Sequence, residues 1–384
     1  MVSKDTEKAM EKFHKWAQNR HEYGKEWKKK TGGKIVGYLC TYTPEELFYA
    51  AGVLPVRIFG GHDSDISIVE PHIHGMYCPF CRSCLAEGLK GKYDYINGIV
   101  IGQSCLHIRQ VFFSWQRHIA HEYEHYIYVP HSNQSAGRYE YLRAELVKVK
   151  ESLEKWMGRT ITDKDLDSGI EICNENRRLL RQVWEFRKQV DPPLTGTEAM
   201  DIVISSQVVD KREHNEALKE LLKELPQRKL DRETGTRLMI IGSEDDDREF
   251  TNMVEAVMNI PATFVIEEHC VGTRYFWNET VPEQDRLMAI SKRYMDRPSC
   301  PSKDWPERTR MPHILKLAKD YNVQAAVVMQ QKFCDPAEFD IPTITKVLNE
   351  NGVPTYFLEF DVTVPVGQFQ TRMEAFLETM IELV

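Results

Sequence analysis

The chain has 384 residues, of which 42% are apolar and 28% charged, a composition typical of a globular protein with two or three domains. A formal net charge of -8 provides no basic field, which argues against a nucleic-acid-binding protein. No apolar run approaches about 18 residues, and the charged N-terminus lacks the apolar core of a secretory signal. We therefore expect a cytoplasmic protein that neither crosses nor binds a membrane.

The beginning of the sequence predicts a helical arm followed by alternating strands and helices. Residues 4–30 are highly charged and place Met10, Phe13 and Trp16 on one face at helical spacing, which predicts an amphipathic helix. Strands are then expected at residues 34–42, 54–61, 98–102 and 125–131, and helices at residues 43–52, 81–89 and 106–119. Such alternation predicts βαβ units and a parallel sheet.

The middle of the chain differs from both halves that flank it. Residues 137–159 and 165–189 are long, charged and helical in pattern, which is typical of a connector and not of a nucleotide-binding fold. The alternation then returns, with strands expected at residues 237–243, 262–270, 323–334 and 353–361, and helices at 244–258, 311–322, 342–352 and 367–383.

These patterns together predict an α/β fold with two Rossmann- or flavodoxin-like parallel-sheet domains. We expect four segments along the chain: an N-terminal helical arm (1–33), a first α/β domain (34–137), a helical connector (138–234) and a second α/β domain (235–384).

Nine cysteines stand out against this background, and a reducing compartment makes a disulfide framework a poor explanation for them. In "YCPFCRSC", Cys78, Cys81 and Cys84 follow one another at three-residue intervals. A ferredoxin-type run would continue with a further cysteine, and a helix would turn these three side chains to different sides. A self-contained cluster is therefore not expected, and zinc is disfavoured because no second Cys-x2-Cys pair exists.

Other cysteines lie at the expected ends of strands, where open parallel sheets bind ligands. Cys105 follows "GIVIGQS", Cys334 follows "AAVVMQQKF" and Cys270 follows "TFVIEEH". Cys105 and Cys334 belong to different expected domains and can face one cleft. A third thiolate from Cys78 would complete a three-cysteine site for an iron–sulfur cluster, whereas the simpler reading is that each thiol is a small buried apolar group.

Several segments taken together resemble the 2-hydroxyacyl-CoA dehydratase and benzoyl-CoA reductase family. They include "YCPFCRSCLAEGL", "GIVIGQSC", "EEHCVGTRYF" and "QQKFCDPAEFDIPTITKVLNENGVPTYFLEFD", in order from about residue 34 onward. The resemblance implies that Cys78, Cys105 and Cys334 hold a [4Fe–4S] cluster. Cys81 and Cys84 stand where the family often has small residues, so it remains open whether one of them replaces Cys78. Cys270 matches a recurring cysteine that is not a ligand.

The resemblance also implies partners. Family members work as hetero-oligomers, with a related cluster-bearing subunit and separate ATP-hydrolysing subunits that deliver low-potential electrons from reduced ferredoxin. This chain has no G-x-x-x-x-G-K-[ST] motif, so ATP and a further iron–sulfur cluster are expected on the partner subunits. The expected substrate is an aryl- or acyl-CoA thioester.

Within the family, "TYTPEELFYAAGVLPVRIFGG" and the short chain are most similar to the third, or gamma, subunit of ATP-dependent benzoyl-CoA reductase. That enzyme reduces benzoyl-CoA to cyclohexa-1,5-diene-1-carbonyl-CoA. The alternatives are a subunit of a 2-hydroxyacyl-CoA dehydratase, which removes water through a ketyl radical, and a non-enzymatic two-domain binding protein whose cysteines are structural. The sequence does not decide which subunit would hold the reacting group.

Two further features are weaker hypotheses. His107, two residues after Cys105, is a candidate for proton transfer near the cluster. Phe112, Phe113 and Trp115 could wall an aryl pocket, although packing inside a helical core is the commoner role of such a group.

Overall fold

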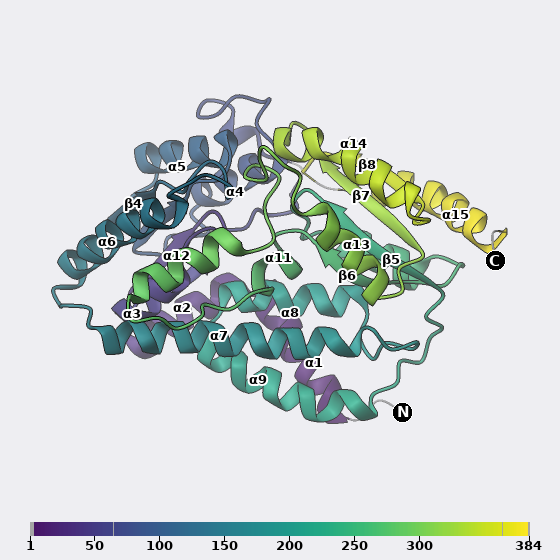
Figure 1. Cartoon of the computed structure of the whole chain (residues 1–384), viewed down its shortest axis with the longest axis horizontal. Helices are drawn as coiled ribbons and strands as arrows, with labels where there is room; N and C mark the ends of the chain where they lie inside the picture. Colours follow the sequence, from purple (N-terminus) through teal and green to yellow (C-terminus); the bar gives the residue numbers. More distant parts are fainter. Residues whose placement is uncertain (1–3, 64, 363, 383–384) are drawn as a thin grey trace.

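The computed structural model of the chain describes residues 4–63, 65–362 and 364–382. It contains two four-stranded parallel sheets with helices packed around them (Figure 1), which confirms the predicted α/β fold. The extreme ends of the first and last expected segments, residues 1–3 and 383–384, lie outside the described residues. The division into four segments remains a prediction.

The first sheet has the strand order β2-β1-β3-β4, with every neighbouring pair parallel. Its strands are β1 (Ile35–Tyr38), β2 (Leu54–Arg57), β3 (Gly98–Gly102) and β4 (Tyr123–Ile127). The helices that follow the first three strands are α3 (Glu45–Ala51), α4 (Pro79–Leu89, after the short turn η1, Ser67–Val69) and α5 (Leu106–His118). The winding direction reverses between β1 and β3, so a ligand-binding crevice is expected beyond their carboxyl ends.

The second sheet repeats this order as β6-β5-β7-β8. Its strands are β5 (Thr236–Gly242), β6 (Ala262–Glu268), β7 (Ala325–Gln331) and β8 (Thr355–Phe360). The helices of this half are α10 (Arg248–Asn252) with the π-helical turn Met253–Val257, α11 (Thr273–Phe276), α12 (Arg286–Asp296), α13 (Met311–Asp320), α14 (Asp335–Glu350) and α15 (Val366–Glu382).

Two element boundaries in this half differ from the sequence prediction. The helix expected at 244–258 begins only at Arg248, because the carboxylate of Asp247 caps it by accepting the backbone N–H of Phe250. Helix α14 begins at Asp335, well before the expected start at Pro342, which lies inside the helix. The earlier start makes Cys334 the residue that precedes the first turn of α14.

The remaining helices support both sheets from one side. They are α1 (Lys4–Gln18), α2 (Arg20–Thr31), α6 (Arg138–Met157), α7 (Asp163–Phe186), α8 (Gly196–Val208), α9 (Lys211–Glu224) and the short turn η2 (Leu225–Gln227). Figure 1 shows α7, α8 and α9 stacked in the lower part of the view. Helix α8 is buried along nearly its whole length and contacts β2 of one sheet and β6 of the other, so it joins the two sheets. Among the described residues, no helix is long and apolar enough to cross a membrane.

Two buried carboxylates at the start of α3 tie the first sheet to the rest of the molecule. Glu46 accepts hydrogen bonds from the guanidinium of Arg177 on α7, at 2.7 Å, and from the hydroxyl of Tyr294 on α12, at 2.9 Å. Glu45 pairs with the ammonium of Lys211 on α9, at 3.0 Å. Burial would raise the pKa of Glu46, but the nearby arginines, Arg177 foremost, lower it to about 2. The Glu46 carboxylate therefore remains charged inside the protein.

Replacing Arg177 by Met leaves the Glu46 carboxylate buried without its cation. We expect the free energy of unfolding to fall by about 3–5 kcal/mol, because an uncompensated buried charge is strongly destabilising. Denaturant unfolding of the purified chain checks this value. Arg286→Met, which breaks a more exposed pair with Asp167, is the control and should cost less than about 1 kcal/mol. Equal losses in the two variants would contradict the role given to the buried pair.

Candidate functional site

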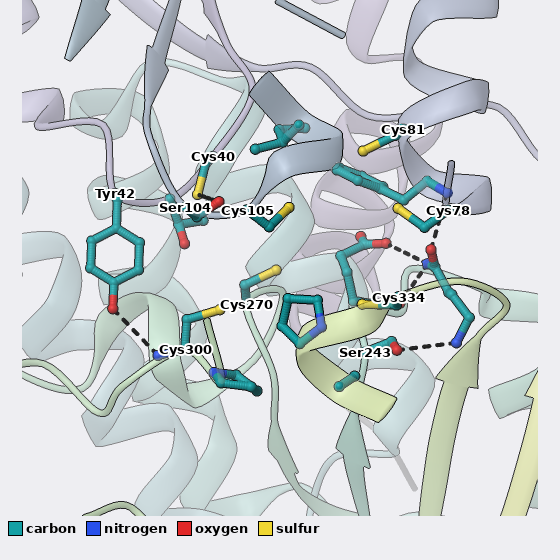
Figure 2. Close-up of a pocket in the computed structure, with 18 of the residues that line it drawn as sticks. Cys40, Tyr42, Cys78, Cys81, Ser104, Cys105, Ser243, Cys270, Cys300 and Cys334 are labelled. Atoms are coloured by element: carbon teal, nitrogen blue, oxygen red, sulfur yellow. Dashed lines mark hydrogen bonds between the residues drawn. The ribbon is translucent and has the colours of Figure 1, made fainter. Parts of the chain in front are cut away.

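A cavity of about 110 Å³ lies where the carboxyl ends of the two sheets face each other (Figure 2). Its walls come from the segments that follow β1, β2 and β3 in the first sheet and β5, β6 and β7 in the second, and from the loop after α12. The reversal of strand order falls between β1 and β3 and between β5 and β7, so the crevices of both sheets open into the same space. One water needs only about 10–15 Å³ of such volume, so the cavity has room for a group of several atoms.

Cysteines dominate the wall of this cavity. All nine cysteines of the chain are free thiols, and seven of them line the cavity: Cys40, Cys78, Cys81, Cys105, Cys270, Cys300 and Cys334. The other two, Cys84 and Cys173, are fully buried elsewhere, as expected for small apolar side chains. Burial of cysteines as small apolar side chains therefore does not explain why seven thiols gather at one cavity.

The structure brings the three predicted cysteines into this one cavity. Cys78, Cys105 and Cys334 are the residues that immediately precede the first turns of α4, α5 and α14. Figure 2 shows their sulfur atoms turned toward a common space. A helix N-terminus carries a partial positive charge that favours a thiolate, so three such ends around one cavity favour negatively charged sulfur there.

Cys78 has the lowest thiol pKa of the three cysteines. Hydrogen bonding with the Cys81 thiol, and also with His107, lowers the pKa of Cys78 from its ordinary 9.0 to about 5 against the opposing effect of burial. The pKa of Cys81 is raised well above 9.0, chiefly by burial and then by the Cys78 thiolate. Of these two neighbours, Cys78 is therefore the residue that carries the negative charge at neutral pH.

The thiols of Cys105 and Cys334 are protonated in the absence of a cation. Burial raises the pKa of Cys105 to about 12, and it raises that of Cys334 well above 9.0. The charge of Cys78 raises both further, so the three groups lie close enough to repel one another as thiolates. The backbone N–H groups of Ile108 and Ala337 act in the opposite direction and favour the charged forms.

The wall also carries positive charge. Arg274 pairs with the Glu268 carboxylate at 3.4 Å, whereas Arg57 and Arg297 form no ion pair with the described residues. Arg57, Arg274 and Arg297 line the cavity, and Glu244 is the one carboxyl group among the described lining residues. Burial raises the pKa of Glu244 well above its usual value, which favours its neutral form. The buried Nε atoms of Arg57 and Arg297 have no hydrogen-bond partner among the described residues. The cavity therefore favours an anionic occupant.

His107 lies behind Cys78 and is not among the residues that line the cavity. Its Nδ1 accepts the backbone N–H of Cys78 at 3.2 Å, and its Nε2 is 3.6 Å from the Asp335 carboxylate. Burial opposes protonation of the imidazole, yet the Cys78 thiolate raises its pKa above 6.5. His107 therefore contacts the backbone of Cys78, and its role in proton transfer remains a prediction.

Core packing, the commoner role considered for the aromatic residues of α5, is confirmed for Phe112 and Trp115, and none of these residues lines the cavity. Phe112 and Trp115 are buried in the core of the first sheet, and Phe113 stacks on Tyr126 away from the cavity. The aromatic rings that do line the cavity are those of Tyr42 and Phe80, which the sequence did not single out.

The sequence reasoning also missed Cys40, Cys300, Arg57 and Arg297 as wall residues. Cys40 could have been found, because it follows the strand β1 as Cys105 follows β3. Cys300 and Arg297 lie in the loop after α12, where no strand end marks them. Their position depends on how that loop folds back toward the first sheet.

No three or more His, Cys, Asp or Glu side chains within the described ranges are spaced to hold a single metal ion. Thiolates that share one ion through bonds of about 2.3 Å lie within roughly 4 Å of one another. The thiolates of an iron–sulfur cluster bind different iron atoms and lie further apart. The described residues therefore contain no preformed single-ion site of the kind zinc requires.

Comparison with known proteins gives consistent matches over nearly the full chain. A family model described as 2-hydroxyglutaryl-CoA dehydratase, D-component, matches residues 40–380. The (R)-phenyllactyl-CoA dehydratase beta subunit of Clostridium sporogenes is 26% identical over 98% of this chain and 100% of its own length. A benzoyl-CoA reductase subunit of Thauera aromatica is 25% identical over 89% and 88%, and the (R)-2-hydroxyglutaryl-CoA dehydratase beta subunit of Acidaminococcus fermentans is 23% identical over 92% and 94%.

The low pKa of Cys78 predicts selective alkylation of the metal-free chain. Because the thiolate is the reactive form, we expect iodoacetamide labelling of Cys78 to rise as the pH passes about 5 and to level off by pH 7. At pH 7, Cys105 and Cys334 should remain unlabelled, and His107→Leu should move the Cys78 midpoint upward. Peptide mass spectrometry measures each site, with the buried Cys173 as an unreactive control. A Cys78 midpoint near 9 would contradict the proposed environment.

Proposed function

The chain belongs to the family described as 2-hydroxyglutaryl-CoA dehydratase, D-component, and from this membership we propose that it is the iron–sulfur subunit of an ATP-dependent benzoyl-CoA reductase. Its relatives are subunits of enzymes that act on CoA thioesters, which supports a role as one subunit of such an enzyme. The observation that carries the proposal is the convergence of three cysteines, each at a helix N-terminus, on one cavity between the two sheets.

We propose that Cys78, Cys105 and Cys334 hold a [4Fe–4S] cluster. The cavity volume and the arginines in its wall support this donor set. Three thiolates leave one iron of such a cluster without a protein ligand, and the bound cluster supplies single-electron transfer at low potential. Cys78 is preferred over Cys81 because its pKa is the lower of the two.

The residues around these thiols have distinct tasks in the proposal. Arg57 and Arg297 stabilise negative charge at the site, and the apolar side chains of Phe80 and Ile108 exclude water from it. The Ser243 hydroxyl favours the thiolate form of Cys334 by a hydrogen bond. Together, these contacts hold the three sulfur atoms in place and set the local polarity on which a reduction potential depends.

The proposal includes partners, because an isolated cluster-bearing chain has no source of low-potential electrons. They are a related cluster-bearing subunit, ATP-hydrolysing subunits with a cluster of their own, reduced ferredoxin as the donor, and an aryl- or acyl-CoA substrate. The names of the relatives as subunits of larger enzymes support a hetero-oligomer.

A 2-hydroxyacyl-CoA dehydratase is the second candidate, and the match to the phenyllactyl-CoA dehydratase beta subunit over 98% of this chain favours it. The two reactions differ in electron balance. Reduction of benzoyl-CoA to the dienoyl-CoA consumes two electrons and two protons, whereas dehydration of a 2-hydroxyacyl-CoA releases water with no net consumption of electrons.

Single substitutions test the ligand set. We expect Cys78→Ser, Cys105→Ser and Cys334→Ser each to lose about four iron atoms per chain relative to the parent, because each removes one ligand of a [4Fe–4S] cluster. Cys81→Ser and the core control Cys84→Ser should keep the parental iron content. Anaerobic purification followed by iron and acid-labile sulfide analysis gives these numbers. Full iron retention in Cys334→Ser would reject the ligand set.

An activity assay separates the two candidate reactions. The chain purified with its partner subunits, supplied with reduced ferredoxin and ATP, should consume benzoyl-CoA and oxidise two ferredoxins for each dienoyl-CoA formed. Chromatography of the CoA thioesters and the absorbance of ferredoxin measure both quantities. Turnover of (R)-phenyllactyl-CoA without net ferredoxin oxidation, and none of benzoyl-CoA, would replace the reductase by the dehydratase.

A further inference from the structure

Three thiols of the cavity have no task in the proposed cluster site. Cys40 lies in the loop after β1, Cys270 follows β6 and Cys300 lies in the loop after α12. Each is half-buried and lines the cavity, unlike the two cysteines in the cores. Figure 2 places them on the side near Tyr42, across from Cys78 and Cys334. Three segments distant in sequence therefore deliver a second set of three thiols to the same space.

The two sets adjoin one another at Cys105. The Sγ of Cys40 from the second set donates a hydrogen bond to the hydroxyl of Ser104 at 3.2 Å, directly beside Cys105 of the first set, and all of these residues line one cavity. The two sets of thiols therefore lie next to each other in the wall of one cavity.

The sulfur atoms of the second set are surrounded by groups that suit metal-bound thiolates. The Arg57 guanidinium donates a hydrogen bond to Cys270 Sγ at 3.1 Å, and the Ser302 hydroxyl donates to Cys300 Sγ at 3.3 Å. Hydrogen bonds and positive charges at cysteine sulfur stabilise its anionic form and tune the potential of a bound cluster.

Buried cations supply an independent argument for negative charge at this end of the cavity. Arg57 and Arg297 line it, and the Lys303 ammonium lies 5.3 Å from the ring of Tyr42 in its wall. Arg57, Arg297 and Lys303 are at most 3% exposed, and none has a carboxylate within ion-pair distance among the described residues. Arg297 and Lys303 donate to backbone carbonyl groups, at 2.6 and 2.8 Å. Buried charges are retained at a large cost unless an opposite charge compensates them. Anionic sulfur in the cavity would provide that compensation.

We propose that Cys40, Cys270 and Cys300 form a second three-thiolate site, which binds a second iron–sulfur cluster beside the first. This inference rests on the proposed function in one respect, namely that the first set also holds a cluster. It assigns Cys270 a ligand role that the family resemblance did not imply. A disulfide would join only two of the three thiols, and a single zinc ion does not fit their spacing.

Iron analysis of the anaerobically purified, natively assembled protein tests the inference. Two cubane clusters predict about eight iron atoms per chain in the parent, against about four for one cluster. The combined variant Cys40→Ser, Cys270→Ser and Cys300→Ser should retain about four. A parent with about four iron atoms overturns the second site whether or not the variant folds, and so does a variant that keeps all the iron of the parent.

A matched variant of the first set separates this result from the proposed function. Combined Cys78→Ser, Cys105→Ser and Cys334→Ser should keep about four iron atoms if the second site binds its own cluster. The core variant Cys84→Ser with Cys173→Ser should keep all eight. A parent protein without iron overturns both proposals. If the parent holds about four iron atoms per chain and loses them only when the first set is changed, the proposed function stands and the second site is rejected. Zinc in place of iron in the parent also overturns the second site.

Electron paramagnetic resonance of the reduced parent gives a readout that needs no substitution. Two paramagnetic clusters in one cavity broaden each other's signals by spin–spin coupling. The combined variant of the second set should show the narrower signal of one isolated cluster. An uncoupled signal in a parent that holds eight iron atoms would contradict the placement of both clusters in this cavity.

Discussion

The site depends on buried charge pairs that hold the carboxyl ends of two separate sheets toward one space. Glu45 and Glu46 begin α3 directly after the β1 loop, and their partners lie on α7, α9 and α12. Both carboxylates are at most 3% exposed, so each partner must stay in place to satisfy them. This requirement fixes the β1 loop against the loop after α12, and it thereby places Cys40 close to Cys300 in the cavity wall.

The same arrangement explains why cysteine and arginine occur together in the cavity. Helix N-termini and buried guanidinium groups favour thiolates, while burial and mutual repulsion favour protonated thiols. Cys78 alone is shifted toward the thiolate, and Cys105 and Cys334 are shifted toward the thiol. Cations bound by the sulfur atoms would resolve this conflict, since they remove the repulsion and let every thiol ionise.

Local sequence patterns were enough to predict the strands and to place the cysteines that follow them, because the carboxyl ends of parallel strands all lie at the same edge of their sheet. They were not enough to choose among Cys78, which immediately precedes α4, and Cys81 and Cys84 within that helix, because the side each sulfur faces depends on how α4 packs. Core packing of Phe112 and Trp115 was the favoured prediction and is confirmed, although a buried helix face does not by itself show whether it packs on a core or on a cavity. The left-handed backbone of Phe333, with a φ of 63° just before Cys334, is not indicated by any sequence pattern.

That strained residue bears directly on the site. A bulky side chain in the left-handed region costs free energy, and it persists only where the surroundings determine the backbone. Here the Phe333 N–H donates to the Glu338 carboxylate at 3.1 Å, and its carbonyl accepts the Asp335 N–H at 2.9 Å. These two bonds set the sharp turn that aims Cys334 from the end of β7 into the cavity. The strain is thus localised at Phe333, directly before the cysteine that the second sheet contributes to the cavity. A looser turn at Phe333 would let the Cys334 sulfur move away from Cys78 and Cys105.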